Sequence, residues 1–460
     1  MNNFDLVSQE KVMEKIEVIE ELVNKDVDEA TTRNLAELLS HEDKGLRNAV
    51  TNFLINNSNP LIPELIINHT LSANVELRNL AGEILVKKGL TSVDIILEKL
   101  ALCENNDNIK FLVDVLGLIG DTKAEDQVLE ILSSNEDENV KLACVETLGN
   151  LKSEKSLDKI LELFEKDEKY RAPVIDAVGK IGSQRALEFI TSNLNTDDEL
   201  LLFIVLECLG EIGDEHTYYE LLSRMNEMTG PPVWPLLESI YKLKEKYNLD
   251  LPFDERMKKN VLETVLNSEP KYQKIAAHMV TIFDDPEILY ACLIIYGTDP
   301  ELDEILNEKF FDYKSLILTK IHNLIDIQPA NLIPLLNITQ NLVQSYQSEL
   351  GELNSFEKHK LTESISKVLN HQDENVRLAA IEALYITNPE SIVLFMDSLI
   401  EDANVWNRMR LLDLIAEINS PEIITALEKL TNDPDEMVKE KANEIFNQLQ
   451  YPTKQTDRDK

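Results

Sequence analysis

The fold of this chain is decided by a short pattern, which is clearest in Asp137-Glu138-Asn139-Val140-Lys141-Leu142-Ala143 and in Asp373-Glu374-Asn375-Val376-Arg377-Leu378-Ala379-Ala380. In nine copies of the pattern, an Asp or Asn stands four places ahead of a position that is Arg or Lys in eight of them. The nine pairs are Asp43/Arg47, Asn74/Arg78, Asn106/Lys110, Asp137/Lys141, Asp167/Arg171, Asp198/Leu202, Asp373/Arg377, Asn404/Arg408 and Asp435/Lys439. The position numbers of successive Asp or Asn members differ by 31, 32, 31, 30 and 31 in the first six pairs, and by 31 and 31 in the last three. A period this regular indicates one structural repeat that is copied in space.

Residues 127–152 show how one repeat is built. The apolar face of a first helix ends at the polar run 133–136, and Asp137 is then placed to accept hydrogen bonds from the amides that start a second helix. Apolar or small side chains recur at three- and four-residue steps in that second helix, at Val140, Ala143, Cys144, Thr147 and Leu148. Each repeat is therefore predicted to be a pair of helices.

Glycines mark the same period independently of the Asp and Asn residues. The position numbers of Gly117, Gly149, Gly179 and Gly210 differ by 32, 30 and 31. A small residue near a helix end lets two helices approach closely or lets the backbone take a positive φ. Two unrelated markers with one period argue against chance.

On these residues the chain resembles the HEAT repeats, in particular the short bacterial kind first associated with phycobilisome lyases. The resemblance covers about residues 31–220 and 360–450. It implies an all-α fold, a right-handed α-solenoid of stacked antiparallel helix pairs, similar to the HEAT and armadillo superhelices, with the second helices on the concave face. It also implies a ladder of Asp and cationic side chains from successive repeats. The ladder would consist of Asp43, Arg47, Asp137, Lys141, Asp167, Arg171, Asp373, Arg377, Asp435 and Lys439, with Asn74, Asn106 and Asn404 lacking the charge and Leu202 interrupting it.

Length and charge limit the possible functions. A chain of 460 residues exceeds the roughly 250–300 residues at which a single core stops growing, and a stack of repeats avoids that limit. The 45 Lys and Arg against 84 Asp and Glu give a net charge of −39. This charge opposes nucleic acids and anionic membranes, whose binding depends on cationic side chains. It favours cationic or neutral partners, although a solvated acidic surface is the alternative interpretation.

The sequence predicts a cytoplasmic protein. The first residues show no secretory signal, and no stretch approaches the roughly 20 apolar residues that cross a bilayer. The four cysteines are far apart, and Cys144 and Cys208 fall in apolar helical patterns, which favours reduced, buried thiols in a reducing compartment.

The repeat pattern lapses in the middle of the chain, which sets the predicted organisation. The interval between Asp198 and Asp373 is not a whole number of repeats, and it is rich in proline and in aromatic residues that include Trp234. It is interpreted as divergent repeats or, alternatively, as a bend or aromatic groove for a partner. The predicted divisions are a capping helix (1–30), regular HEAT repeats (31–220), divergent and longer helical repeats (221–355), C-terminal HEAT repeats (356–450) and a disordered tail (451–460).

No catalytic signature appears in the sequence. It has no glycine-rich phosphate loop and no HExxH, and its seven histidines share no spacing that suits one metal site. His41-Glu42 resembles one of the His-Glu pairs of the HEAT-type di-iron deoxyhypusine hydroxylases, but that family needs several such pairs. We therefore predict no enzyme activity, no cofactor and no metal.

A candidate binding surface lies two places before the Arg or Lys position. Six of the nine residues there are polar or glycine, which indicates an exposed position, and the exceptions are Leu200, Trp406 and Met437. Exposed Trp and Met beside Arg377, Arg408 and Arg410 would form an interface hot spot. The alternative is that Trp406 is buried against a neighbouring repeat.

The sequence therefore favours a non-catalytic protein-binding scaffold or adaptor in a regulatory or assembly pathway, working through the concave face of an acidic HEAT solenoid. Its partner would be another protein, with a basic or amphipathic binding segment. The first alternative is a bilin-lyase-like enzyme or a chaperone subunit that acts on an acceptor protein. The second is a HEAT protein that handles nucleic acid, which the charge opposes.

Overall fold

The computed structural model of the chain describes residues 9–23, 25, 27–225, 227–283, 285–416, 418 and 420–450. All regular structure in these residues is helical. The chain divides into two compact units, one of Met1–Arg224 with Lys242–Leu249 and one of Met225–Tyr241 with Asp250–Lys460. We call them unit 1 and unit 2 and describe each by itself.

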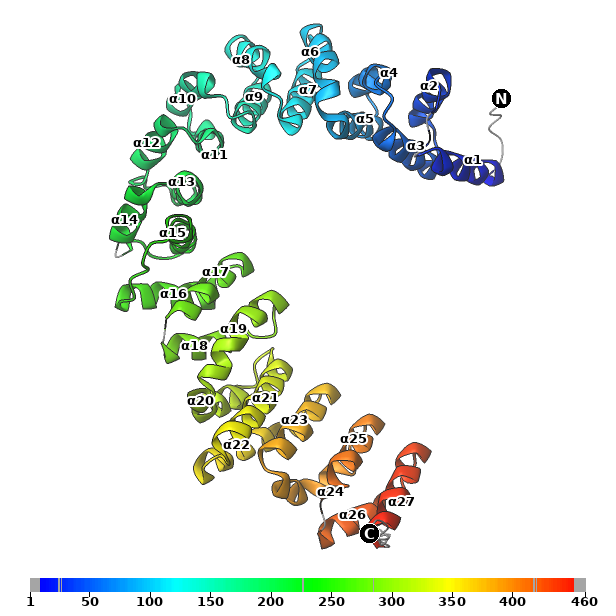
Figure 1. Cartoon of the computed structure of the whole chain (residues 1–460), viewed down its shortest axis with the longest axis vertical. Coiled ribbons are helices and arrows are strands. Elements are labelled where there is room, and N and C mark those ends of the chain that lie inside the picture. Colours follow the sequence, from blue (N-terminus) through cyan, green and yellow to red (C-terminus); the bar gives the residue numbers. More distant parts are fainter. Residues whose placement is uncertain are drawn as a thin grey trace, which may run out of the picture. The chain divides into compact units, whose positions relative to one another are not determined.

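Unit 1 consists of consecutive helix pairs (Figure 1). Its helices are α1 (Gln9–Leu22), α2 (Glu29–Glu37), α3 (Lys44–Asn56), α4 (Ile62–Ile66), α5 (Val75–Lys88), α6 (Val93–Ala101), α7 (Asn106–Ile119), α8 (Glu125–Ser134), α9 (Glu138–Asn150), α10 (Leu157–Lys166), α11 (Arg171–Ile181), α12 (Gln184–Ser192), α13 (Glu199–Ile212) and α14 (Glu215–Arg224). The second helices of successive pairs pack side by side, α7 on α9, α9 on α11 and α11 on α13. They form one row of the unit, and the first helices α6, α8, α10 and α12 form the other (Figure 1).

Unit 2 repeats this arrangement. Its helices are α16 (Glu255–Asn267), α17 (Pro270–Ile282), α18 (Pro286–Cys292), α19 (Pro300–Asp312), α20 (Lys314–Ile327), α21 (Leu332–Leu350), α22 (Ser355–Val368), α23 (Glu374–Thr387), α24 (Met396–Leu399), α25 (Val405–Ile415), α26 (Pro421–Leu430) and α27 (Glu436–Gln450), while α15 (Val233–Tyr247) has residues in both units. Here α21, α23, α25 and α27 pack in sequence as the second-helix row. A 3₁₀ segment, η7 (Pro389–Phe395), precedes α24.

The core of each repeat is the apolar stripe that the sequence predicts. In α9, Val140, Cys144 and Leu148 are fully buried between the neighbouring helices. Gly149 is required by close packing, because a Cβ there would lie 2.7 Å from the Cα of Ala177 on α11. Gly182 ends α11 with a φ of 65°, which only glycine adopts without strain.

These features confirm the predicted all-α fold of stacked helix pairs. The five-part division at residues 30, 220, 355 and 450 stays a prediction. Residues 451–460, predicted to be a disordered tail, lie outside the described residues, as do residues 1–8 of the predicted capping helix.

Candidate functional site

The second helices begin in one recurring way. The Asp or Asn ahead of each helix is its N-cap, and its side-chain oxygen accepts the free amides of the first turn. Asp137 accepts from the amides of Asn139 and Val140 at 2.9 and 3.1 Å, and Asn404 accepts from Trp406 and Asn407 at 2.8 and 3.2 Å. Two predicted caps differ from this pattern. Asn105 and not Asn106 caps α7, and Asp167 caps a 3₁₀ turn (Glu168–Tyr170) that leads into α11. Positions are named below by their distance from the capping Asp or Asn. N1 to N6 are the residues that follow it, and N″ is the residue two places before it.

A second recurring residue, at N″, was missed by the sequence analysis. Its side chain accepts a hydrogen bond from the backbone amide of the cap itself, as His371 Nδ1 does from Asp373 at 3.1 Å. The same bond is made by His41, Ser72, Asn135, Thr196, Asp402 and Asp433. These residues share the period of the repeats but vary in type, so a search for a shared acceptor rather than a shared residue would have found them.

The cation at N4 points back to the loop before its own helix, as helical side chains lean toward the N-terminus. Arg47 donates to the carbonyl oxygens of His41 and Glu42 at 2.7 and 2.8 Å. Arg377 donates in the same way to the carbonyl oxygens of His371 and Gln372 at 2.8 and 3.1 Å. This contact fixes the turn between the two helices of a repeat.

The ladder implied by the resemblance takes a different form in the structure. The cap carboxylates of Asp43, Asp137, Asp167, Asp373 and Asp435 accept from amides of their own first turns through Oδ1. The cations instead reach other acids. The pairs are Arg47–Glu76, Lys141–Glu136, Arg171–Glu168, Arg377–Asp402 and Lys439–Glu436.

Two of the inter-repeat ion pairs are buried and bidentate. Arg377 donates through Nε and Nη2 to the two carboxylate oxygens of Asp402, both at 2.8 Å. Arg408 contacts Asp433 with the same two distances. The carboxylate side chains are only 3% and 4% exposed. Burial raises the pKa of Asp402, but its hydrogen bonds, led by that from Arg377, outweigh this and hold the pKa below its usual value.

The three apolar residues at N2 are exposed. The exposed fractions are 80% for Leu200, 64% for Trp406 and 49% for Met437. The alternative in which the stack buries Trp406 is therefore wrong. Trp406 and Met437 occupy the same position on α25 and α27, which pack against each other, whereas Leu200 lies in unit 1.

The arginines predicted to join them are less accessible. Arg377 and Arg408 are 14% and 8% exposed, and both are engaged by the buried aspartates. Arg410 is more exposed but is paired with Glu382 at 2.7 Å. We therefore retain Trp406 and Met437 as candidate contact residues and assign Arg377 and Arg408 to holding the repeats together.

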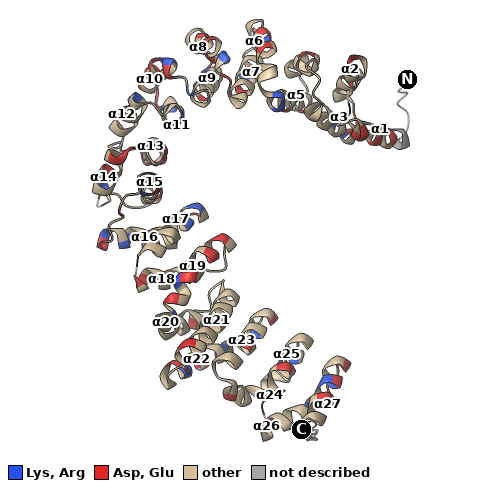
Figure 2. Cartoon of the chain, in the orientation of Figure 1, with Lys and Arg blue, Asp and Glu red and all other residues tan. Residues whose placement is uncertain are grey.

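The charge around these residues is strongly negative. Residues 371–450 contain sixteen Asp and Glu and six Lys and Arg, a net charge of −10. All six cations form ion pairs inside this segment, namely Arg377–Asp402, Arg408–Asp433, Arg410–Glu382, Lys429–Asp397, Lys439–Glu436 and Lys441–Asp413. Figure 2 shows acidic residues on helices of both units, with the basic residues scattered among them.

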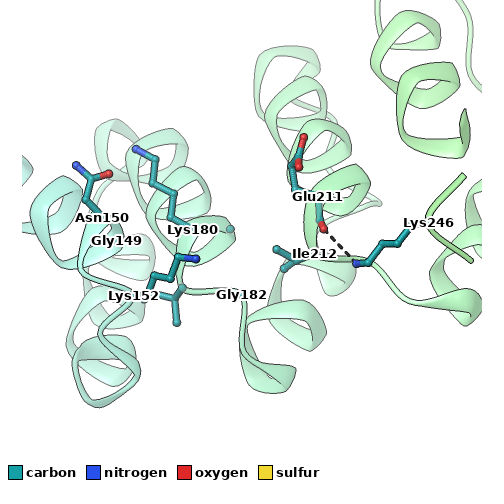
Figure 3. A pocket seen from close by; sticks show the side chains of 10 residues that line it. Gly149, Asn150, Lys152, Lys180, Gly182, Glu211, Ile212 and Lys246 are labelled. Atoms are coloured by element: carbon teal, nitrogen blue, oxygen red, sulfur yellow. Dashed lines mark hydrogen bonds between the residues drawn. The ribbon is translucent and has the colours of Figure 1, made fainter. Parts of the chain in front are cut away.

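A cavity of about 610 Å³ opens in unit 1 at the C-terminal ends of α9, α11 and α13 (Figure 3). Three of its lining residues are Lys152, Lys180 and Lys246. Lys246 donates to the carbonyl oxygens of Glu211 and Gly213 at 3.3 and 3.1 Å, and Lys180 is paired with Asp176 at 2.8 Å. Lys246 thus stabilises the C-terminal end of α13, and Lys180 is neutralised by a carboxylate of its own helix.

Three of the four cysteines are buried. Among the described residues, no group of three or more His, Cys, Asp or Glu is placed to hold a metal ion. Cys144, Cys208 and Cys292 are buried as free thiols, and burial raises the pKa of each to about 12, so they are protonated at neutral pH. Within the described part of the chain, the helices are all too short or too polar to cross a membrane.

Paired helices that stack in two rows, with capped second helices and inter-repeat ion pairs, define the class of α-solenoid repeat proteins. Residues 93–172 match a family model described as HEAT repeats. For these residues the match confirms the resemblance to HEAT repeats seen in the sequence. No curated protein matches it.

Two solved structures show a general likeness to the whole chain. One is a homology model of the full-length AP-3 complex in an intermediate open conformation, with 13% identity, a TM-score of 0.34, and coverage of 97% of this chain and 86% of that one. The other is a crystal structure of importin beta, with 10% identity, a TM-score of 0.41, and coverage of 96% and 75%. Scores this low say nothing about the function of this chain.

Proposed function

We propose that this chain is a non-catalytic protein-binding scaffold or adaptor. The observation that carries the proposal is the exposure of Leu200, Trp406 and Met437 at N2, where most other repeats have a polar residue or glycine. Large apolar and aromatic side chains at such positions cost solubility and gain free energy only when a partner covers them. The second-helix rows, which the resemblance places on the concave face, would supply the binding surface.

The charge supports a cationic partner. A net charge of −39 steers basic surfaces toward the chain and accelerates their association, and salt screens that attraction. The partner in this proposal is a protein with a basic or amphipathic segment rather than a nucleic acid or a membrane. A cytoplasmic location and a role in regulation or assembly belong to the same proposal.

The test compares partners captured by the full chain and by surface variants. Wild type, the Trp406→Ala/Met437→Ala pair and Leu394→Ala would each be tagged and incubated with native lysate, and the captured proteins quantified by mass spectrometry at low and high salt. Leu394 is a matched control, since it is a large exposed apolar residue of the same unit that lies on η7 rather than at N2.

We expect a set of proteins that the control retains and the double variant loses, with recovery falling as salt rises. Circular dichroism melts would check that all three proteins are folded. A captured set that is the same for all three proteins would refute the assignment of this surface.

A further inference from the structure

The surface around Trp406 and Met437 also defines the shape of its partner. Trp406 at N2 of α25 and Met437 at N2 of α27 are exposed, and Met409 lies one turn after Trp406 on the same helix face and is half-buried. We call these three residues the Trp406–Met437 surface. The inference below rests on the proposed function and concerns what this surface binds.

The surface is held rigidly. The side-chain amide of Asn407, beside Trp406, is buried and donates to the carbonyl oxygen of Glu374 at 3.0 Å and to Asp402 at 3.2 Å. Arg408, the next residue, is held by the bidentate pair with Asp433. Trp406 is therefore exposed on a fixed backbone, and a partner that covers it loses little free energy to ordering this side of the interface.

Trp406 and Met437 are the two anchors of this surface, and their spacing favours one secondary structure for the partner. Equivalent positions on two packed helices are separated by about the interaxial distance, roughly 8–10 Å. On one face of an extended strand, side chains recur at roughly 7 and 13 Å, about 1 Å below and 3 Å above this range. On one face of an α-helix, residues i and i+7 are about 10.5 Å apart, which is nearer to this range than either strand spacing.

The charges select the sequence of that helix. All six cations of residues 371–450 are already ion-paired within the segment, and its net charge is −10. Glu440 is exposed one turn after Met437, and Glu374 is exposed at N1 of α23. Lys or Arg beside the anchors would meet carboxylates, whereas Asp or Glu would meet like charge.

We propose that the Trp406–Met437 surface binds an amphipathic helix that carries two apolar residues seven positions apart and Lys or Arg on either side of them. The helix runs across α25 and α27, along the direction in which the repeats stack. One apolar residue packs on Trp406 and Met409, and the other packs on Met437.

The test uses synthetic fluorescent peptides and the full chain. A first peptide has two Leu residues seven apart in an Ala and Lys background. A second has the same composition with the Leu residues five apart, and a third has Glu in place of Lys. Binding would be measured by fluorescence anisotropy at two salt concentrations.

We expect the first peptide to bind at least about tenfold more tightly than either of the others. Its affinity should fall with salt, fall by about tenfold or more in both Trp406→Ala and Met437→Ala, and stay unchanged in Leu394→Ala. Because the chain has two Trp residues, Trp234→Phe leaves Trp406 as the only one, and its emission should shift to the blue on binding.

Equal binding of the two Lys peptides, or affinity that does not depend on Trp406, would overturn the proposal of a helix. If the peptides fail while capture from lysate still depends on Trp406 and Met437, the scaffold function stands and the partner has another form, such as an extended segment. If neither depends on these residues, both proposals fail.

Discussion

The cations at N4 behave differently in the repeats of unit 1 and in the last repeats of unit 2. In unit 1, the buried Nε atoms of Arg47, Arg78 and Arg171 have no hydrogen-bond partner among the described residues. In unit 2, the Nε atoms of Arg377 and Arg408 donate to Asp402 and Asp433. The arginine at the equivalent position of different repeats therefore has a partner for its Nε in unit 2 and none among the described residues in unit 1.

The difference lies in one residue of the next repeat. Asp402 and Asp433 follow their arginines at one and the same separation in the sequence. The equivalent positions after Arg47, Arg78 and Arg171 are occupied by Ser72, Cys103 and Thr196, none of which carries a charge. Without the carboxylate, Arg47 turns to the exposed Glu76, and Arg78 lies over the ring of Phe111. The residue at N″ thus decides how firmly two repeats are joined.

The largest expected effect comes from removing one buried carboxylate. Asp402→Ala leaves Arg377 as a buried charge without its partner and also removes the acceptor for the amide of Asn404. Breaking a buried pair in this way costs about 3–5 kcal/mol of unfolding free energy. Urea unfolding followed by circular dichroism would measure it.

Glu76→Ala is the matched control, because it removes the carboxylate that Arg47 reaches in unit 1. Its side chain is half-exposed, so the expected loss is below about 1 kcal/mol. Equal losses in the two variants would show that the buried and the exposed pair contribute equally to the free energy of unfolding. The residue at N″ would then not decide how firmly two repeats are joined.

The intermediate effect is a dependence on pH. The pKa of Asp402 is lower in the folded chain than its usual value, so its ion pair contributes stability above about pH 4, and this contribution is lost as pH falls through the lowered folded value. Asp402→Asn keeps an acceptor oxygen but cannot titrate. We expect the wild type to be the more stable protein at neutral pH and its advantage over Asp402→Asn to shrink below about pH 4.

Urea midpoints of both proteins between pH 7 and pH 2.5 would give the difference directly. The other acidic residues titrate in both proteins, so they largely cancel from it. An advantage of the wild type that stays constant over this range would show that the pKa of Asp402 is the same in the folded and unfolded chains, and would refute its lowering by the ion pair.

How much of this was accessible from the sequence depends on the range of each interaction. Caps such as Asp137 and Asn404 act on the two or three residues that follow them, so their spacing predicted the second helices. The errors are one residue at Asn106 and, at Asp167, a 3₁₀ turn that precedes α11. The contact between Arg377 and Asp402 joins two repeats, and their separation in the sequence has meaning only once the distance between neighbouring helices is known. Exposure of Trp406 was likewise undecided, since an apolar residue near the start of a helix fits both a core and a surface.

The smallest expected effect is also the most direct test of the comparison, because it transfers the feature of unit 2 to unit 1. Ser72 lies at N″, accepts from the amide of Asn74 at 3.1 Å, and stands in the same place relative to Arg47 as Asp402 does to Arg377. An aspartate there can keep the amide bond and offer a second oxygen to the buried Nε of Arg47. Hydrogen bonds to charged groups are worth more than neutral ones, but burying the new carboxylate offsets part of the gain, so we expect Ser72→Asp to stabilise the chain by about 1 kcal/mol.

The control for this transfer is Ala73→Asp, measured by the same urea unfolding. It adds the same charge one residue away, where the side chain is exposed, and should leave the urea midpoint nearly unchanged. If both variants shift the midpoint equally, the added charge and not the geometry at N″ is responsible, and the proposed cause of the difference between the two regions fails.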